Sequence, residues 1–77
     1  MIEQLQYLAS CGRPWAELRA RLAIDLLNQA HQGLISEDEY KELMADLVRT
    51  DKLEEEADDL DLKNMLVSTI MVVGKLA

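Results

Sequence analysis

The sequence predicts an all-α protein, a small bundle of three or four helices. Hydrophobic residues make up 49% of the 77 residues and charged residues 30%, while there are three glycines, one proline and no phenylalanine. Apolar residues recur three and four positions apart, as on one face of a helix. A proline and a capping box, both helix-start signals, precede two of these stretches. The length fits a single helical domain spanning residues 1–77.

The first third of the chain predicts two helices. Three apolar residues spaced three apart predict a short helix over Ile2–Ala9. A turn follows, because the residue before Pro14 is pushed out of helical conformation. The proline itself suits the first position of the next helix, where its missing N–H costs nothing. This second helix is predicted over Pro14–Gln32, and Gly33 supplies the stop.

The start of the third helix has the best-defined local signal. Ser36 and Glu39 form a capping box, in which each side chain accepts from the backbone N–H of the other residue. Ile35 and Tyr40 are placed to pack together as a hydrophobic staple. These signals predict a helix over Glu37–Arg49.

The last third predicts a helix over Lys52–Val73 with a possible break near Asp59–Asp61. Thr50-Asp51 is the predicted hinge before it, because both residues are good N-caps. One long helix running through this hinge is the alternative. Met65–Val73 contains several β-branched residues, so a strand is the alternative to a helix there.

The apolar stripes predict which side chains are buried. The expected core is Leu18, Leu22, Leu26, Tyr40, Leu43, Leu47, Leu53 and Leu60. The segment Met65–Val73 is apolar all round, which is typical of an element enclosed on every side. A chain this short buries too little surface to enclose it alone, so the sequence predicts a homo-oligomer. The predicted interface consists of Met65, Leu66, Val67, Ile70, Met71 and Val73.

Charge is concentrated in one segment of the chain. The net charge is −7, and residues 36–62 hold twelve acidic and three basic residues. No basic face is available to contact phosphates, which argues against direct binding of nucleic acid. The pattern predicts that an acidic face of this protein binds a basic surface on a partner protein. The alternative is that the face is acidic only because it is exposed to solvent. The predicted partner-binding residues are Glu54, Glu55, Glu56, Asp58, Asp59 and Asp61.

Other features limit the classes of function. The lone Cys11 excludes an internal disulfide and favours a cytoplasmic setting, or the host cytoplasm for a viral protein. His31 has no second histidine or cysteine with which to form a zinc site. The most apolar window, Met65–Val73, is nine residues long, whereas a membrane span needs about 20. We therefore predict no membrane span, no cofactor and no catalytic residue.

Two acidic motifs nevertheless support an enzymatic alternative. Glu39 and Glu42 form an E-x-x-E pattern, and Glu55 and Asp58 form an E-x-x-D pattern twelve residues later. This pair resembles the motifs of the MazG-type all-α nucleoside-triphosphate pyrophosphohydrolases. The resemblance implies that the four carboxylates hold Mg²⁺ on the phosphates of the substrate. Such an arrangement requires the chain to reverse at Thr50-Asp51.

A second resemblance covers Leu26–Leu47. The run from Gly33 to Tyr40, between two amphipathic helices, is similar to the short C-terminal (SHOCT) two-helix module, which implies an oligomerisation or docking hairpin. In its small size and acidity, the chain as a whole resembles the short acidic orphan proteins of tailed phages. The prediction is a non-enzymatic accessory, regulatory or inhibitor factor that self-associates and presents an acidic face. A pyrophosphohydrolase and a structural virion or scaffold component are the alternatives.

Overall fold

The all-α prediction is confirmed. The structure, a computed structural model, describes residues 2–49 and 51–75, and this part of the chain contains five helices and no strand. None of the helices in these ranges is both long and apolar enough to span a bilayer. The helices are α1 (Ile2–Leu8), α2 (Pro14–His31), α3 (Glu37–Arg49), α4 (Asp51–Glu56) and α5 (Leu60–Val73).

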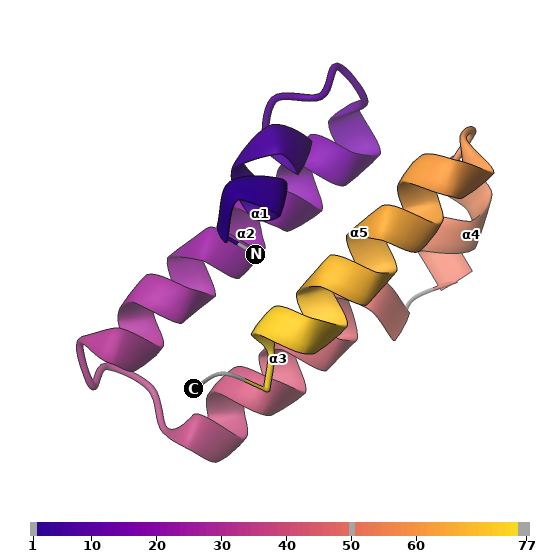
Figure 1. The fold of residues 1–77 in the computed structure, drawn as a ribbon. Coiled ribbons are helices and arrows are strands. Elements are labelled where there is room, and N and C mark those ends of the chain that lie inside the picture. The colour runs from indigo at the N-terminus through magenta and orange to yellow at the C-terminus, as the bar shows by residue number, and fades with distance from the viewer. Residues whose placement is uncertain (1, 50, 76–77) are drawn as a thin grey trace.

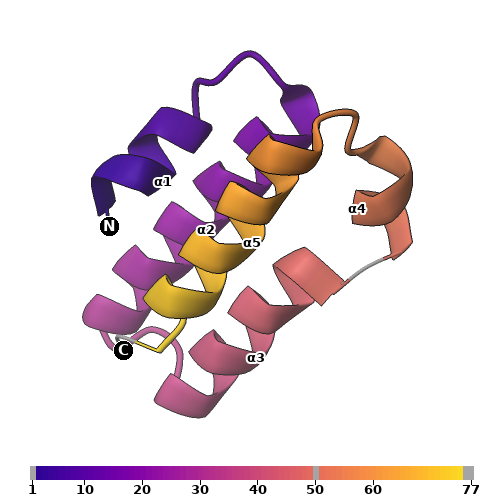
Figure 2. The same cartoon turned by 45° about the vertical axis from the view of Figure 1, so that its right-hand side comes forward.

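Four of the helices pack side by side and α4 caps one end (Figure 1). α1 and α3 lie on either side of α2, and both run antiparallel to it (Figure 2). α5 returns along the bundle and packs against α1, α2 and α3. The principal extents of the molecule are 35 × 24 × 17 Å. The core therefore lies between α5 and the helices α1, α2 and α3.

The predicted boundaries of α2 are confirmed at its N-terminal end. Pro14 is its first residue, and the preceding Arg13 is extended, with a φ of −111°. Gly12 has a φ of +90°, a conformation that residues with a Cβ rarely adopt. The Gly12 N–H donates a 2.9 Å hydrogen bond to Oε2 of Glu17. The turn is thus tied to the first turn of α2.

Gly33 ends α2 as predicted. Its φ is +74°, and its N–H donates to the carbonyl of Ala30 at 3.1 Å. The N–H of Leu34 donates to the carbonyl of Gln29 at 2.9 Å. These two bonds form a Schellman motif, which satisfies carbonyls that the helix leaves free. The chain then reverses into α3.

The capping box at the start of α3 is also confirmed. The Glu39 N–H donates to Oγ of Ser36 at 3.1 Å, and the Ser36 N–H donates to Oε1 of Glu39 at 3.3 Å. Ile35 is half-buried and packs on the core to which Tyr40 belongs. The sequence therefore placed the α2–α3 connection correctly at both of its ends.

A break divides the predicted fourth helix. α4 ends at Glu56, and the chain reverses over residues 57–59 before α5 begins at Leu60. Oδ1 of Asp59 accepts from the Leu62 N–H at 3.0 Å, which makes Asp59 the N-cap of α5. The possible break near Asp59–Asp61 is thus confirmed, and the strand alternative is wrong. Thr50, half of the predicted hinge, lies outside the described residues.

The predicted core is wrong in half of its members. Tyr40 and Leu53 are buried, and Leu26 and Leu47 are half-buried. Four leucines are exposed instead: Leu18 by 58%, Leu22 by 41%, Leu43 by 40% and Leu60 by 69%. The buried apolar residues are Leu5, Leu8, Trp15, Ala16, Ala20, Ala23, Leu27, Tyr40, Met44, Leu53, Leu66, Ile70 and Val73.

The error on α2 has a physical reason. α2 has two apolar faces, one rich in alanine and one rich in leucine, and α5 packs on the bundle side of this helix. Ala16, Ala20 and Ala23 are completely buried there. Small side chains allow two helices to approach closely. The leucine face of α2, which carries Leu18 and Leu22, therefore lies outside the core.

The expectation that one copy cannot enclose the C-terminal apolar segment is wrong for three of its residues. Leu66, Ile70 and Val73 are completely buried within the chain, and Val67 is half-buried. α5 achieves this burial by packing on three other helices. Met65 and Met71 remain exposed, by 41% and 46%. The three buried residues belong to the core and are not free to contact a second copy in this fold.

Candidate interaction surfaces

Most of the predicted acidic docking residues have partners within the chain. Oε1 of Glu54 lies 2.6 Å from Nζ of Lys63, which comes from α5. Glu56 and Asp58 bind residues at the start of α2, and Asp59 caps α5. Four of the six carboxylates thus hold α4 and the following turn in place, a structural role that the charge pattern of the sequence does not reveal.

Arg19 is the main link between α4 and the rest of the bundle. Its side chain is only 10% exposed. Nε donates to the carbonyl of Leu47 at 3.1 Å, and one terminal nitrogen donates to the carbonyl of Trp15 at 3.0 Å and to Oε2 of Glu56 at 3.3 Å. The guanidinium therefore joins α2, the end of α3 and α4. This role is not among those predicted from the sequence, although Arg19 stands four residues after Trp15 on an apolar stripe, which is a signal for it.

Trp15 and Asp58 form a second link at the same end of the bundle. The indole Nε1–H of the 6% exposed Trp15 donates to Oδ1 of Asp58 at 3.1 Å. Asp58 also lies 3.8 Å from a terminal nitrogen of Arg13. A buried indole usually needs such an acceptor. The carboxylate of Asp58 is therefore directed toward the start of α2.

Other carboxylates of the acidic segment are free of such contacts. Glu55 and Asp61 are exposed, and no described residue bonds to their side chains. Asp38 and Glu42 on α3 are exposed in the same way. These four exposed carboxylates, two on α3, one on α4 and one in the first turn of α5, are together called the acidic surface below.

The four residues of the pyrophosphohydrolase motif do not form a metal site. Residues 2–49 and 51–75 contain no group of three or more His, Cys, Asp or Glu side chains that could hold a metal ion. Glu39 is engaged in the capping box, and Asp58 binds Trp15. The chain reverses after α4 rather than between α3 and α4. Glu42 and Glu55 consequently lack the facing carboxylates that the motif would need.

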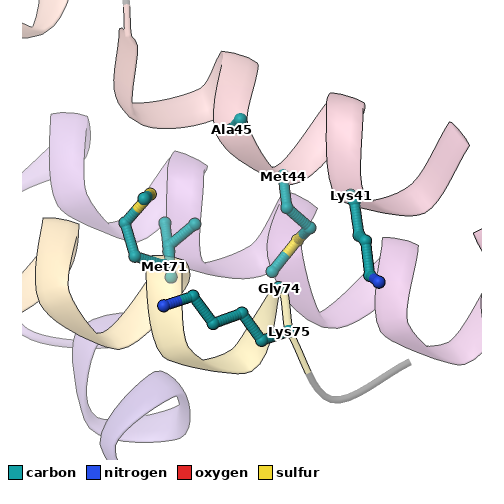
Figure 3. A pocket seen from close by; sticks show the side chains of 7 residues that line it. Lys41, Met44, Ala45, Met71, Gly74 and Lys75 are labelled. Carbon is teal, nitrogen blue, oxygen red and sulfur yellow. The ribbon is translucent and has the colours of Figure 1, made fainter. Parts of the chain in front are cut away.

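A shallow hollow lies between α3 and the end of α5 (Figure 3). Its volume is about 200 Å³, below the roughly 300–1,000 Å³ of typical ligand pockets. The thioether chains of Met44 and Met71 and the stems of Lys41 and Lys75 line it. Lys41 is already paired with Glu37 at 3.0 Å. The hollow thus lacks the buried polar groups that would orient a small-molecule ligand.

The exposed apolar residues of α5 are divided between two sides of the helix. Met71 lines the hollow next to α3, whereas Met65 and Val72 line a second hollow of about 190 Å³ beside Gln4 of α1. Exposed Ser68 lies in the second hollow as well. The predicted interface on α5 is therefore reduced to small, separate apolar areas.

Exposed and half-buried leucines form an apolar surface on α2 and α3, which pack against each other. Because the Leu47 carbonyl bonds to Arg19 and the two helices are antiparallel, Leu43 comes level with Leu22 one turn further along. Leu18 and Leu22 are four residues apart on one face of α2. We call this surface the leucine seam, and it consists of Leu18, Leu22, Leu26, Leu43 and Leu47.

The two residues considered for chemistry have ordinary surroundings. Cys11 is a free, half-buried thiol that packs on the core. His31 is exposed at the last position of α2, where a histidine interacts well with the helix dipole.

Comparison with known proteins identifies no relatives of this chain. No family model matches it, and neither a curated protein nor a solved structure is significantly similar. Function must therefore be argued from the surfaces of the molecule.

Proposed function

We propose that the protein is a non-enzymatic interaction protein that presents its acidic surface to a basic partner protein and also self-associates. One observation carries the proposal. Residues 36–62 have an excess of nine negative charges, and three basic residues from outside this segment pair with it: Arg13, Arg19 and Lys63. Two thirds of the excess therefore remains without a basic partner from the described parts of the chain.

Such a surplus favours a basic partner for an electrostatic reason. Clustered charges of one sign raise the rate of association with an oppositely charged surface and suppress binding to like-charged ones. The field of the acidic surface extends about 8 Å at physiological ionic strength. Glu55 and Asp61 contribute most directly, because they are exposed and make no bond to a described residue.

The arrangement favours binding over catalysis. Glu54, Glu56, Asp58 and Asp59 bond within the chain around α4, the turn after it and the start of α5. The four motif carboxylates do not converge on one point. No observation favours a virion or scaffold role over an accessory one.

A lysine-rich amphipathic helical peptide is a suitable probe, followed by fluorescence anisotropy at low and high salt. We expect binding that weakens with salt, and a larger loss of affinity in Glu55→Lys than in Glu3→Lys. The two variants change the net charge equally, and Glu3 is an exposed residue of α1. Equal losses in both variants, or no binding at low salt, would contradict the proposal.

A further inference from the structure

We infer that α4 and the two residues after it form a displaceable cap, which opens as one unit while the other four helices stay folded. This segment, residues 51–58, is called the α4 cap below. In the closed state three of its carboxylates are paired within the chain, and in the open state a basic partner binds them. The inference rests on the proposed function, the binding of a basic partner, and states how that binding is regulated.

The α4 cap contributes little to the packing of the bundle. Among the described residues, the more extensive contacts between helices are all formed by α1, α2, α3 and α5. Leu53 is the one buried residue of α4, and the other twelve buried apolar residues lie on the other helices. A helix of six residues is marginal in water without such packing. The four remaining helices therefore keep nearly all of their core when the cap leaves.

Polar contacts that are partly exposed to solvent hold the rest of the cap. Oε1 of Glu54 lies 2.6 Å from Nζ of Lys63, on α5. Oε2 of Glu56 lies 3.3 Å from a terminal nitrogen of Arg19, and Asp58 accepts from an indole N–H of α2 at 3.1 Å. The side chains of the three carboxylates are between 44% and 72% exposed. Ion pairs with such exposed members contribute little to stability, because water competes for them.

Opening of the cap leaves the groups beneath it with other partners. Arg19 keeps the carbonyls of Leu47 and Trp15, which belong to α3 and α2. A buried charge that lost every partner would hold the cap shut. Asp59 follows the cap and accepts from the Leu62 N–H, so α5 keeps its N-cap. The boundary between the moving and the fixed part therefore falls between residues 58 and 59.

The open state presents more negative charge than the closed state. Residues 36–62 have an excess of nine negative charges, and Arg13, Arg19 and Lys63 pair with three carboxylates of the cap. Opening frees these carboxylates and exposes Leu53 beside them, which suits a basic surface with room for one apolar side chain. Because the same carboxylates cannot bind both sets of cations, the partner shifts the equilibrium toward the open state.

Hydrogen exchange of individual N–H groups, followed by NMR on the full chain, tests the opening. The Ala57 N–H donates to the Leu53 carbonyl at 2.9 Å within the cap, and the Trp15 indole N–H donates to Asp58. We expect one common protection factor for these two groups, at least about tenfold below that of the core amides of α5.

Two other results of the exchange experiment would overturn the inference. Loss of protection at Ala57 alone would mean that α4 frays without releasing Asp58. Protection of the Trp15 indole equal to that of the α5 amides would mean that the cap opens only when the whole protein unfolds.

A pair of charge-matched variants tests the link between opening and binding. Lys63→Met removes the partner of Glu54 but keeps an apolar stem of similar length. It should lower both protection factors about two- to fivefold, the range that a weak ion pair allows. Lys75→Met is the control, since Lys75 is an exposed lysine at the other end of α5 and its loss changes the net charge equally. It should leave both protection factors unchanged.

The affinity for the lysine-rich peptide completes the test. If only the open state binds, the affinity rises with the open fraction. Lys63→Met should therefore bind the peptide about two- to fivefold more tightly than Lys75→Met. Equal affinities of the two variants would contradict the inference. The proposed function is judged separately, by comparing Glu55→Lys with Glu3→Lys, so the two failures are distinguishable.

Discussion

The phenol of Tyr40 donates a 2.8 Å hydrogen bond to the backbone carbonyl of Val73, and both side chains are completely buried. Tyr40 belongs to the first turns of α3, and Val73 is the last residue of α5. The last carbonyls of a helix have no partner within it. The bond therefore satisfies a carbonyl that α5 leaves free and ties the C-terminal helix to the centre of the chain.

Tyr40→Phe should lower the free energy of unfolding by about 1–2 kcal/mol, because the carbonyl of Val73 loses its partner in a buried position. Urea denaturation followed by circular dichroism measures the change. Tyr7→Phe is the matched control, since Tyr7 is 59% exposed, and it should leave the stability within experimental error. Equal stability of Tyr40→Phe and the wild type would show that the bond contributes nothing.

The same tyrosine predicts a pH dependence at alkaline pH. Burial raises the pKa of Tyr40 above its usual value of 10.0. Below about pH 10 both folded and unfolded chains keep the proton, and above it the unfolded chain loses the proton first. The free energy of unfolding should therefore fall as the pH rises from about 10 toward the folded-state pKa. In Tyr40→Phe this part of the fall should be missing, which denaturation at several alkaline pH values would reveal.

Arg19→Met should destabilise the protein by about 2–3 kcal/mol, because it removes donors from two carbonyls and from Glu56 while keeping much of the side-chain volume. Arg19→Lys should recover only part of the loss, since an ammonium group cannot reproduce the planar guanidinium fork. Arg21→Met is the comparison, because Arg21 is exposed and donates only to the Ala9 carbonyl. Thermal denaturation of the three variants gives the order, and a larger loss in Arg21→Met would refute the role of Arg19.

Asp58→Ala should shift the fluorescence of the single tryptophan and cost about 0.5–1.5 kcal/mol, because the indole of Trp15 loses its acceptor. Emission at longer wavelength in the native state is the expected sign that α4 has moved away and admitted water. Glu55→Ala removes a neighbouring exposed carboxylate without such a bond and should leave the spectrum unchanged. Identical spectra for all three proteins would mean that Asp58 does not hold the turn.

Millimolar Mg²⁺ should not raise the melting temperature beyond the effect of NaCl at the same ionic strength, because Glu39, Glu42, Glu55 and Asp58 do not converge. Differential scanning fluorimetry makes the comparison. An increase of several degrees that is specific to Mg²⁺, together with turnover of nucleoside triphosphates, would restore the pyrophosphohydrolase alternative.

Local signals in the sequence were sufficient to predict the first three helices and the connections between them, and to place a possible break near Asp59–Asp61 in the predicted fourth helix. Pro14, Gly33, the Ser36 capping box and the N-cap at Asp59 all act within a few residues of themselves. Their effect does not depend on the rest of the fold, so reading them in order gave the boundaries nearly correctly.

The burial pattern could not be predicted in the same way. α2 carries two apolar faces, and only the path of α5 decides that the alanine face is the buried one. The roles of Arg19 and Asp58 likewise depend on where α4 comes to lie relative to α2, a contact between residues about 40 positions apart. Periodicity identifies a face as apolar, but it cannot say which of two such faces the core will use.

The position of α5 also has a consequence for synthesis of the protein. Because α1, α2 and α3 each pack against it, a nascent chain that has not yet released α5 from the ribosome lacks Leu66, Ile70 and Val73, three of the thirteen buried apolar residues. Folding of this bundle must then wait for α5 to emerge. Premature termination before that helix would leave a product open to proteolysis.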